Sequence, residues 1–92
     1  MDPNKIIGEV ATLTGIPVSA ITGKRRTQGV IAARTLAFEA IRQQFPAWSQ
    51  GEISEFMGRK DHSTTVYAKR RFANFCEQDR NFRQTAKELG LI

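Results

Sequence analysis

The chain has 92 residues and a mass of 10.3 kDa, the size of one domain, and its 40% hydrophobic and 25% charged content is typical of a soluble globular protein. A core this small favours a binding module over an enzyme, because it leaves little room for a shielded active site. With one cysteine and one histidine, we expect no disulfide, no metal and no cofactor. No apolar run is long enough to span a membrane and the first residues lack a signal-peptide pattern, so we expect a cytoplasmic protein.

The positive charge is concentrated in two short segments. Residues 24–34 and residues 59–71 carry +4 each, whereas the other 68 residues sum to −3. Charge placed in this way suits a polyanion, and the phosphate backbone of a nucleic acid fits best. A membrane surface is the alternative, but it requires an amphipathic helix with apolar side chains opposite the basic ones. Neither segment has that pattern.

The first half of the sequence predicts three helical pieces and a basic loop. Apolar residues recur at helical spacing over about 3–14, and a short apolar piece follows over 17–22, in which Ser19 is a candidate helix cap. The basic run at 24–26 comes directly after a glycine, which indicates a loop. A long helix is predicted over 29–45, buried on most sides, and it ends where proline follows.

The second half predicts two helices joined by a short turn, and then a tail helix. Residues 49–52 match a capping box and begin a helix of about two turns that Gly58 closes. Asp61 can cap a longer helix in which apolar and basic residues interleave. The tail over 79–89 repeats the pattern of a cap followed by helical periodicity. No strand signal competes, so we predict an all-α domain of about five to six helices.

Residues 49–72 have the arrangement of a helix-turn-helix, in which a short capped helix and a glycine-containing turn precede a second helix. The second helix of such a motif enters the major groove of DNA with its N-terminus first, so its first exposed residues can touch base edges. A carboxylate accepts from cytosine, imidazole and hydroxyl groups bond to purine edges, and a threonine methyl meets a thymine methyl. The predicted base-reading residues are Asp61, His62, Ser63 and Thr64.

Basic residues about two turns further along this helix are expected to position the protein on the DNA. Lys69, Arg70 and Arg71 are placed to reach phosphates instead of bases. Free amides at the start of the first helix, at 49–51, are candidates for one more phosphate contact.

The segment from Gly58 to Arg71 resembles a known family signature. Its sequence, GRKDHSTTVYAKRR, is similar to that of the C-terminal DNA-binding domain (domain IV) of the bacterial chromosomal replication initiator DnaA, in which a glycine, a basic residue, Asp-His-Thr-Thr, an apolar pair and Ala-x-Arg-Lys follow one another. The resemblance covers about residues 3–72 of the single domain, and 73–92 form a C-terminal helical extension. Departures occur at residues 27–33, which lack the arginines and proline common in the family, at Arg59, which replaces a frequent glycine, and at Ser63, where threonine is usual.

The resemblance implies further roles for individual residues. The last arginine of the family's basic loop enters the minor groove, which assigns this role to Arg26. It also implies that residues of the basic loop, of the following helix and of the start of the helix-turn-helix contact the sugar-phosphate backbone of the DNA. The predicted phosphate contacts are Lys24, Arg25, Arg34, Thr35, Gln50, Gly51, Lys60, Lys69, Arg70 and Arg71.

Sequence-specific binding of double-stranded DNA is therefore the expected function, at an initiator-type site in origin or promoter DNA, in replication initiation or its regulation. We expect location on the bacterial nucleoid and replication proteins as further candidate partners. The chain has no Gly-rich phosphate loop, so we expect no nucleotide. The glycine near the C-terminus and the capped start favour a free-standing module over a fragment. The alternative function is a protein-interaction module or inhibitor that docks on a replication protein, with incidental basic charge.

Several residues have simpler interpretations. The adjacent Asp61, His62 and Ser63 cannot form a catalytic triad, which needs separate elements, so we expect no enzyme and no catalytic residue. Trp48 is expected to pack against the helix that follows it, with base stacking as the alternative. Cys76 is expected to be a small core residue. Phe72, Phe75, Phe82 and Leu89 belong either to the core or to an exposed stripe for dimerisation.

Overall fold

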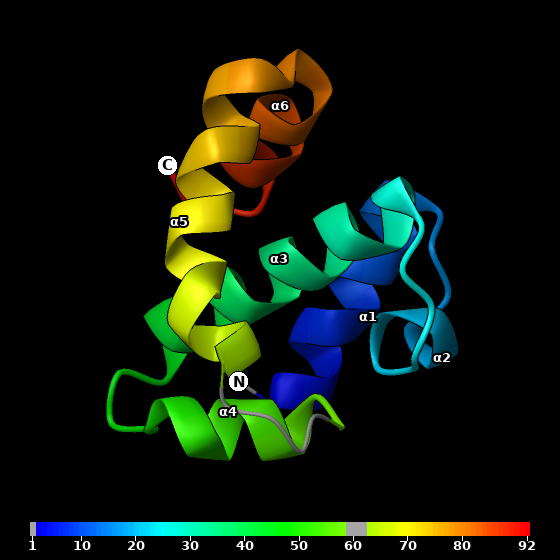
Figure 1. The fold of residues 1–92 in the computed structure, drawn as a ribbon. Helices are drawn as coiled ribbons and strands as arrows, with labels where there is room; N and C mark the ends of the chain where they lie inside the picture. The colour runs from blue at the N-terminus through cyan, green and yellow to red at the C-terminus, as the bar shows by residue number, and fades with distance from the viewer. Residues whose placement is uncertain (1, 59–62) are drawn as a thin grey trace.

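Six helices make up the part of the chain that the computed structural model describes, which is residues 2–58 and 63–92, with side chains described at 2–58 and 68–92. Within these ranges there is no strand, which confirms the all-α class. Among the residues that the structure describes, no helix is both long and apolar enough to cross a lipid bilayer. The helices, shown in Figure 1, are α1 (Pro3–Thr14), α2 (Val18–Ile21), α3 (Gln28–Gln44), α4 (Gln50–Phe56), α5 (Ser63–Gln78) and α6 (Arg80–Glu88).

Local signals set the ends of the first two helices. The Asp2 side chain accepts from the amide of Asn4 at 2.9 Å, and Pro3 occupies the first turn of α1. The predicted cap of the second helix was wrong. Ser19 lies inside α2, and Pro17, with φ −66°, is the N-cap residue without a side-chain bond. The fixed φ of proline lets the helix begin before the serine is reached.

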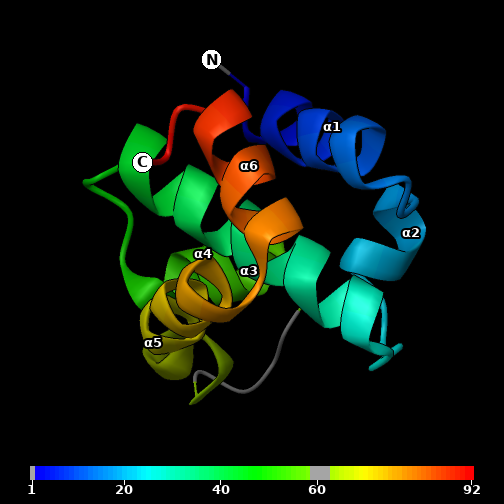
Figure 2. The same cartoon turned by 90° about the horizontal axis from the view of Figure 1, so that it is seen from above.

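Helix α3 forms the centre of the domain. Ten of its 17 residues are buried, which confirms the prediction that this helix is buried on most sides. Alanines at 33, 37 and 40 let neighbouring helices approach closely, and α1 and α5 pack against it most extensively. Figures 1 and 2 show α3 crossing the middle of the domain between these two helices.

Aromatic contacts join the C-terminal helices to this core. The ring of Phe82 lies 5.6 Å from that of Phe72 and 4.8 Å from that of Phe75. Phe72 and Phe82 are buried, while Phe75, Cys76 and Leu89 are partly buried against the same core, so the stripe faces inward and is not an exposed dimerisation surface. Burial raises the pKa of the Cys76 thiol, more than the charge of Arg83 lowers it, which fits a packed thiol.

The Trp48 ring packs where α3 gives way to α4. It lies 5.8 Å from the ring of Phe56 in α4 and 5.2 Å from that of Phe45. This confirms its packing against the helix that follows it. The connection thereby fixes the direction in which α4 leaves the core.

Candidate nucleic-acid interface

The first helix of the helix-turn-helix is fixed by a complete capping box. The Ser49 hydroxyl accepts from the amide of Glu52 at 3.1 Å, and the Glu52 carboxylate accepts from the amide of Ser49 at 3.0 Å. Ile53 and Ser54 bury the inner face of α4. Gly58 follows the C-cap residue of α4 and has φ +76°, a conformation that favours glycine. The predicted capping box and glycine stop are confirmed.

The second helix of the motif, α5, is described from Ser63 onward. Ser63 and Thr64 form the first turn of α5, where the structure describes their backbone alone. Lys60, Asp61 and His62 lie outside the described residues, so their roles, including the capping of a helix by Asp61, remain predictions.

The basic turn of α5 combines one buried side chain with three exposed ones. Phe72 points into the core, whereas Lys69, Arg70 and Arg71 are exposed. The interleaving of apolar and basic residues in the sequence thus separates into an inner face and a charged outer face. The three cations are free to meet a polyanion from the solvent side.

A buried carboxylate of α3 lies close to this basic turn. Glu39 is 6% exposed and accepts from Arg42 Nε at 2.8 Å and from Gln43 Nε2 at 2.9 Å. Burial alone would raise the pKa of Glu39, but these hydrogen bonds and the charges of Arg42 and Lys69 outweigh it and hold the pKa below its ordinary value. Glu39 is therefore ionised at neutral pH and offsets part of the charge of Lys69.

The basic run Lys24–Arg26 forms an exposed loop between α2 and α3, as predicted. A buried arginine of α3 holds the backbone of this loop. Arg34 is 7% exposed, and its Nε donates to the carbonyl of Ile21 at 2.8 Å. Its Nη2 donates to the carbonyls of Gly23 and Arg25, both at 3.0 Å, and of Ala20 at 3.2 Å.

The predicted phosphate contacts of Arg34 and Thr35 need correction. The Arg34 guanidinium is covered by the loop that it holds, and Thr35 is 3% exposed with its hydroxyl donating to the carbonyl of Ile31 at 2.8 Å. Both side chains are nearly buried and bonded to protein carbonyls, so this arrangement does not favour the direct phosphate contacts that the resemblance implied. Because α3 is buried on most sides, these two residues face protein and support the fold.

The basic loop before α3 and the first described turns of α5 lie toward the same side of the domain. In Figure 2 the loop before α3 and the first turns of α5 lie toward the lower edge, whereas α1 and both termini lie toward the upper edge. A notch of about 330 Å³ separates the start of α3 from α5, and its lining contains one cation, three carboxamides and no acid. The lining residues are Gln28, Ile31, Arg71, Asn74, Phe75 and Gln78.

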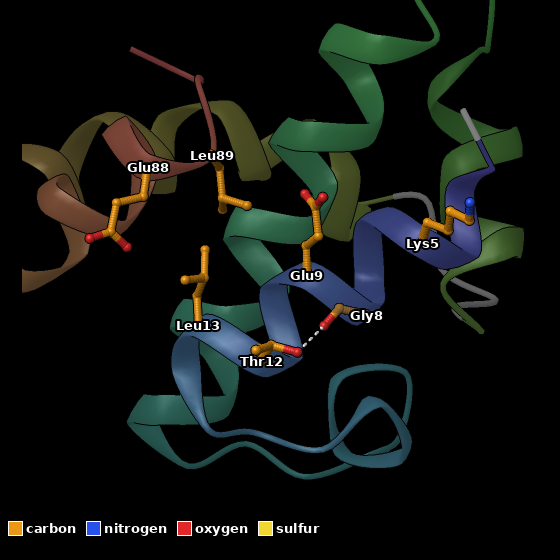
Figure 3. A pocket seen from close by; sticks show the side chains of 7 residues that line it. All are labelled: Lys5, Gly8, Glu9, Thr12, Leu13, Glu88 and Leu89. Atoms are coloured by element: carbon orange, nitrogen blue, oxygen red, sulfur yellow. Dashed lines mark hydrogen bonds between the residues drawn. The ribbon is translucent and has the colours of Figure 1, made fainter.

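A larger, open groove of about 640 Å³ lies elsewhere, between α1 and the end of α6. Figure 3 shows its apolar floor of Leu13 and Leu89, with the charged side chains of Lys5, Glu9 and Glu88 around it. None of its residues belongs to either basic segment. Among the described residues there is also no group of three or more side chains suited to a metal ion.

Comparison with known proteins identifies the family. The bacterial DnaA protein helix-turn-helix family matches residues 3–71. The chain belongs to this family. The resemblance predicted from the sequence is thereby confirmed, and the matched region contains the basic loop, α3, α4 and the basic turn of α5.

Similar full-length relatives carry the name chromosomal replication initiator protein DnaA. Those of two strains of Thermus thermophilus are each 33% identical to this chain over 88 residues. That of Mycoplasma capricolum subsp. capricolum is 28% identical over 89 residues. The matches cover 96–97% of this chain but 20% of each relative, so this DnaA-family domain spans about one fifth of their length.

Two features of the interface were missed in the sequence. They are the support that Arg34 gives to the basic loop and the carboxylate of Glu39 beside the basic turn. A signal for both was present, since each is a charged residue within a helix predicted to be buried on most sides. A charge in such a place needs partners, and here the partners are backbone carbonyls and neighbouring side chains.

Proposed function

We propose that this DnaA-family domain binds double-stranded DNA sequence-specifically at an initiator-type site in origin or promoter DNA, and that it acts in replication initiation or its regulation. The observation that carries the proposal is that the exposed basic loop before α3 and the first described turns of α5, the helix that bears the exposed basic turn, lie toward one side of the domain. One is a loop and the other follows the turn of a helix-turn-helix. Such a surface matches adjacent grooves of a duplex.

In this proposal the N-terminus of α5 reads base edges in the major groove. Asp61, His62, Ser63 and Thr64 supply the acceptors, donors and methyl group that distinguish base pairs there. The first described turn of α5, which contains Ser63 and Thr64, supports this arrangement.

Arg26 enters the neighbouring minor groove. An A·T-rich minor groove is narrow and concentrates negative potential, so one guanidinium gains more there than on an open phosphate. The exposed position of Arg26 in a loop outside any helix supports this role.

The DNA phosphates between the two grooves contact the other polar residues of the proposed surface. The notch beside Arg71 suits one phosphate, with the carboxamides of Gln28 and Asn74 as additional donors. The remaining proposed backbone contacts are Lys24, Arg25, Gln50, Gly51, Lys60, Lys69 and Arg70.

Two settings fit this proposal. The domain either serves as the DNA-binding part of an initiator like its relatives, or occupies initiator boxes by itself and competes with a full-length initiator. Docking on a replication protein without DNA is less favoured, because incidental charge does not explain why the basic loop and the first described turns of α5 lie toward one side of the domain.

Fluorescence anisotropy on labelled duplexes, with and without an initiator-type box, tests the proposal as salt is varied. If about five phosphates are neutralised, log affinity should fall against log salt with a slope of roughly −4 to −5. Arg70→Gln combined with Arg71→Gln should reduce the steepness of that slope by about 2.

The matched control removes two charges from α6, outside the proposed surface. Arg80→Gln combined with Lys87→Gln should leave the slope unchanged, since both side chains are exposed on α6 and belong to neither basic segment. A slope near zero for the unmodified protein, or equal changes in the two double variants, would contradict the proposal.

A further inference from the structure

The basic loop depends on a side chain far from it in sequence. Arg34 lies 9 to 14 residues after the carbonyl groups that it binds, at the end of α2 and in the loop itself. The last carbonyls of a helix have no partner within the helix, and one planar guanidinium with several donors can satisfy them and the loop carbonyls together. The backbone next to Arg26 is thereby attached to α3.

The same loop also touches the helix-turn-helix. A Cβ atom added to Gly58, at the end of α4, would lie 2.9 Å from the carbonyl oxygen of Thr22, where the loop begins. Glycine therefore permits a close backbone contact between the turn and the loop. Thr22 directly precedes Gly23, whose carbonyl Arg34 binds.

We infer that Arg34 is a positioning residue for DNA recognition. It holds the basic loop against α3 and against the turn at Gly58, so that Arg26 meets the minor groove at a fixed place relative to the N-terminus of α5. This inference rests on the proposed function, and it replaces the direct phosphate contact first expected of Arg34. The charge of Arg34 does not act on DNA. Its hydrogen bonds hold the loop in place, and Arg26 on that loop makes the contact with DNA.

Arg34→Lys separates geometry from charge. Lysine keeps the positive charge but carries one nitrogen, which cannot reach carbonyls spread over several residues. If Arg34 contacted phosphate, the lysine variant would retain most of the affinity and the salt dependence. If Arg34 positions the loop, the lysine variant loses the minor-groove contribution as fully as Arg34→Gln does.

The experiment measures affinity for one initiator-type box with either A·T or G·C flanks. We expect Arg34→Lys to bind the A·T-flanked duplex about tenfold more weakly than the unmodified protein and to lose the preference between flanks. Adding Arg26→Ala to Arg34→Lys should then change affinity little, because the two substitutions remove the same contact. The inference would be overturned if Arg34→Lys retained the flank preference. It would also be overturned if the loss of affinity in the double variant equalled the product of the losses in the two single variants.

Arg83→Lys is the matched control, since Arg83 in α6 also donates to a backbone carbonyl, that of Cys76 at 2.9 Å. It should keep both affinity and flank preference. Circular dichroism verifies that each variant is helical. If the Arg34 variants do not fold, Gly58→Ala disturbs the same junction from the other side, and it should also abolish the flank preference. Retention of that preference by a folded Gly58→Ala overturns the inference.

The two proposals fail in different ways. An unmodified protein that binds box and scrambled duplexes alike refutes the proposed function. If the unmodified protein prefers the box but not A·T flanks, the inference alone is overturned, because the loop then has no groove contact for Arg34 to position.

Discussion

The basic loop and the basic turn of α5 expose the same kind of charge but are held in different ways. The cations of α5 stand on a regular helix whose other face is anchored by Phe72. The loop has no helical hydrogen bonds of its own, and the buried Arg34 supplies bonds to its backbone. The comparison indicates that a helix can present charge through its own periodicity, whereas a loop needs a partner from elsewhere in the chain.

The largest expected effect comes from damage to the helix that carries both regions. Leu36 is 1% exposed in α3, and Leu36→Ala should lower the free energy of unfolding by about 2–5 kcal/mol, because it leaves a cavity in the core. Urea denaturation measures the change. Leu13→Ala, at a position that is 43% exposed, is the control and should have a much smaller effect. Equal losses would contradict the central role of α3.

The next effect separates reading from positioning within the helix-turn-helix. His62→Ala or Thr64→Ala should cost about 1–3 kcal/mol of binding free energy on the preferred site and much less on random DNA, because a base contact is lost. Arg71→Ala should weaken binding to both kinds of duplex about equally. Competition binding measures both. If all three variants lose affinity equally on both duplexes, α5 is not the reading helix.

A smaller effect tests the loop alone. Arg26→Lys keeps the charge but loses the flat, weakly hydrated group that suits a narrow groove. We expect binding about fivefold weaker on a box with A·T flanks and little change with G·C flanks. The two proteins are compared on the two duplexes at fixed salt. Equal losses on both flanks would make Arg26 an ordinary phosphate contact.

The smallest effect concerns the carboxylate beside the basic turn. The pKa of Glu39 is lowered in the folded protein from its ordinary value of 4.5, so its ionised form stabilises the fold above that pH. This contribution is lost as the pH falls below about 4.5 toward the folded-state pKa. Glu39→Gln should remove that part of the pH dependence of unfolding. Identical pH profiles for the two proteins would contradict the role of Glu39.

The sequence predicts the features of this fold that depend on neighbours along the chain. The capping box at Ser49 and Glu52, the loop at 24–26 and the boundaries of the long helices all follow from residues a few positions apart. The family resemblance, confirmed over 3–71, adds the position of the helix-turn-helix.

The features that the sequence did not predict depend on distant contacts. Arg34 and Thr35 were assigned to DNA from the family resemblance, whereas the carbonyls that Arg34 binds are brought to it by the packing of α2 on α3. Ser19 was misassigned for a local reason, since either it or Pro17 can begin a short helix. The alternative of an exposed phenylalanine stripe was settled by the packing of α6 on α5.

The close contact of Gly58 with Thr22 has a consequence for spacing along the DNA. If the loop and the turn move as one body, the distance between the minor-groove and major-groove contacts is a property of the protein. One extra base pair between the box and its A·T flank shifts the flank by about 3.4 Å along the duplex and rotates it by roughly a tenth of a turn. A loop held in place cannot follow that shift. In the proposed binding mode, such a domain would select DNA by the length between two features as well as by the features themselves.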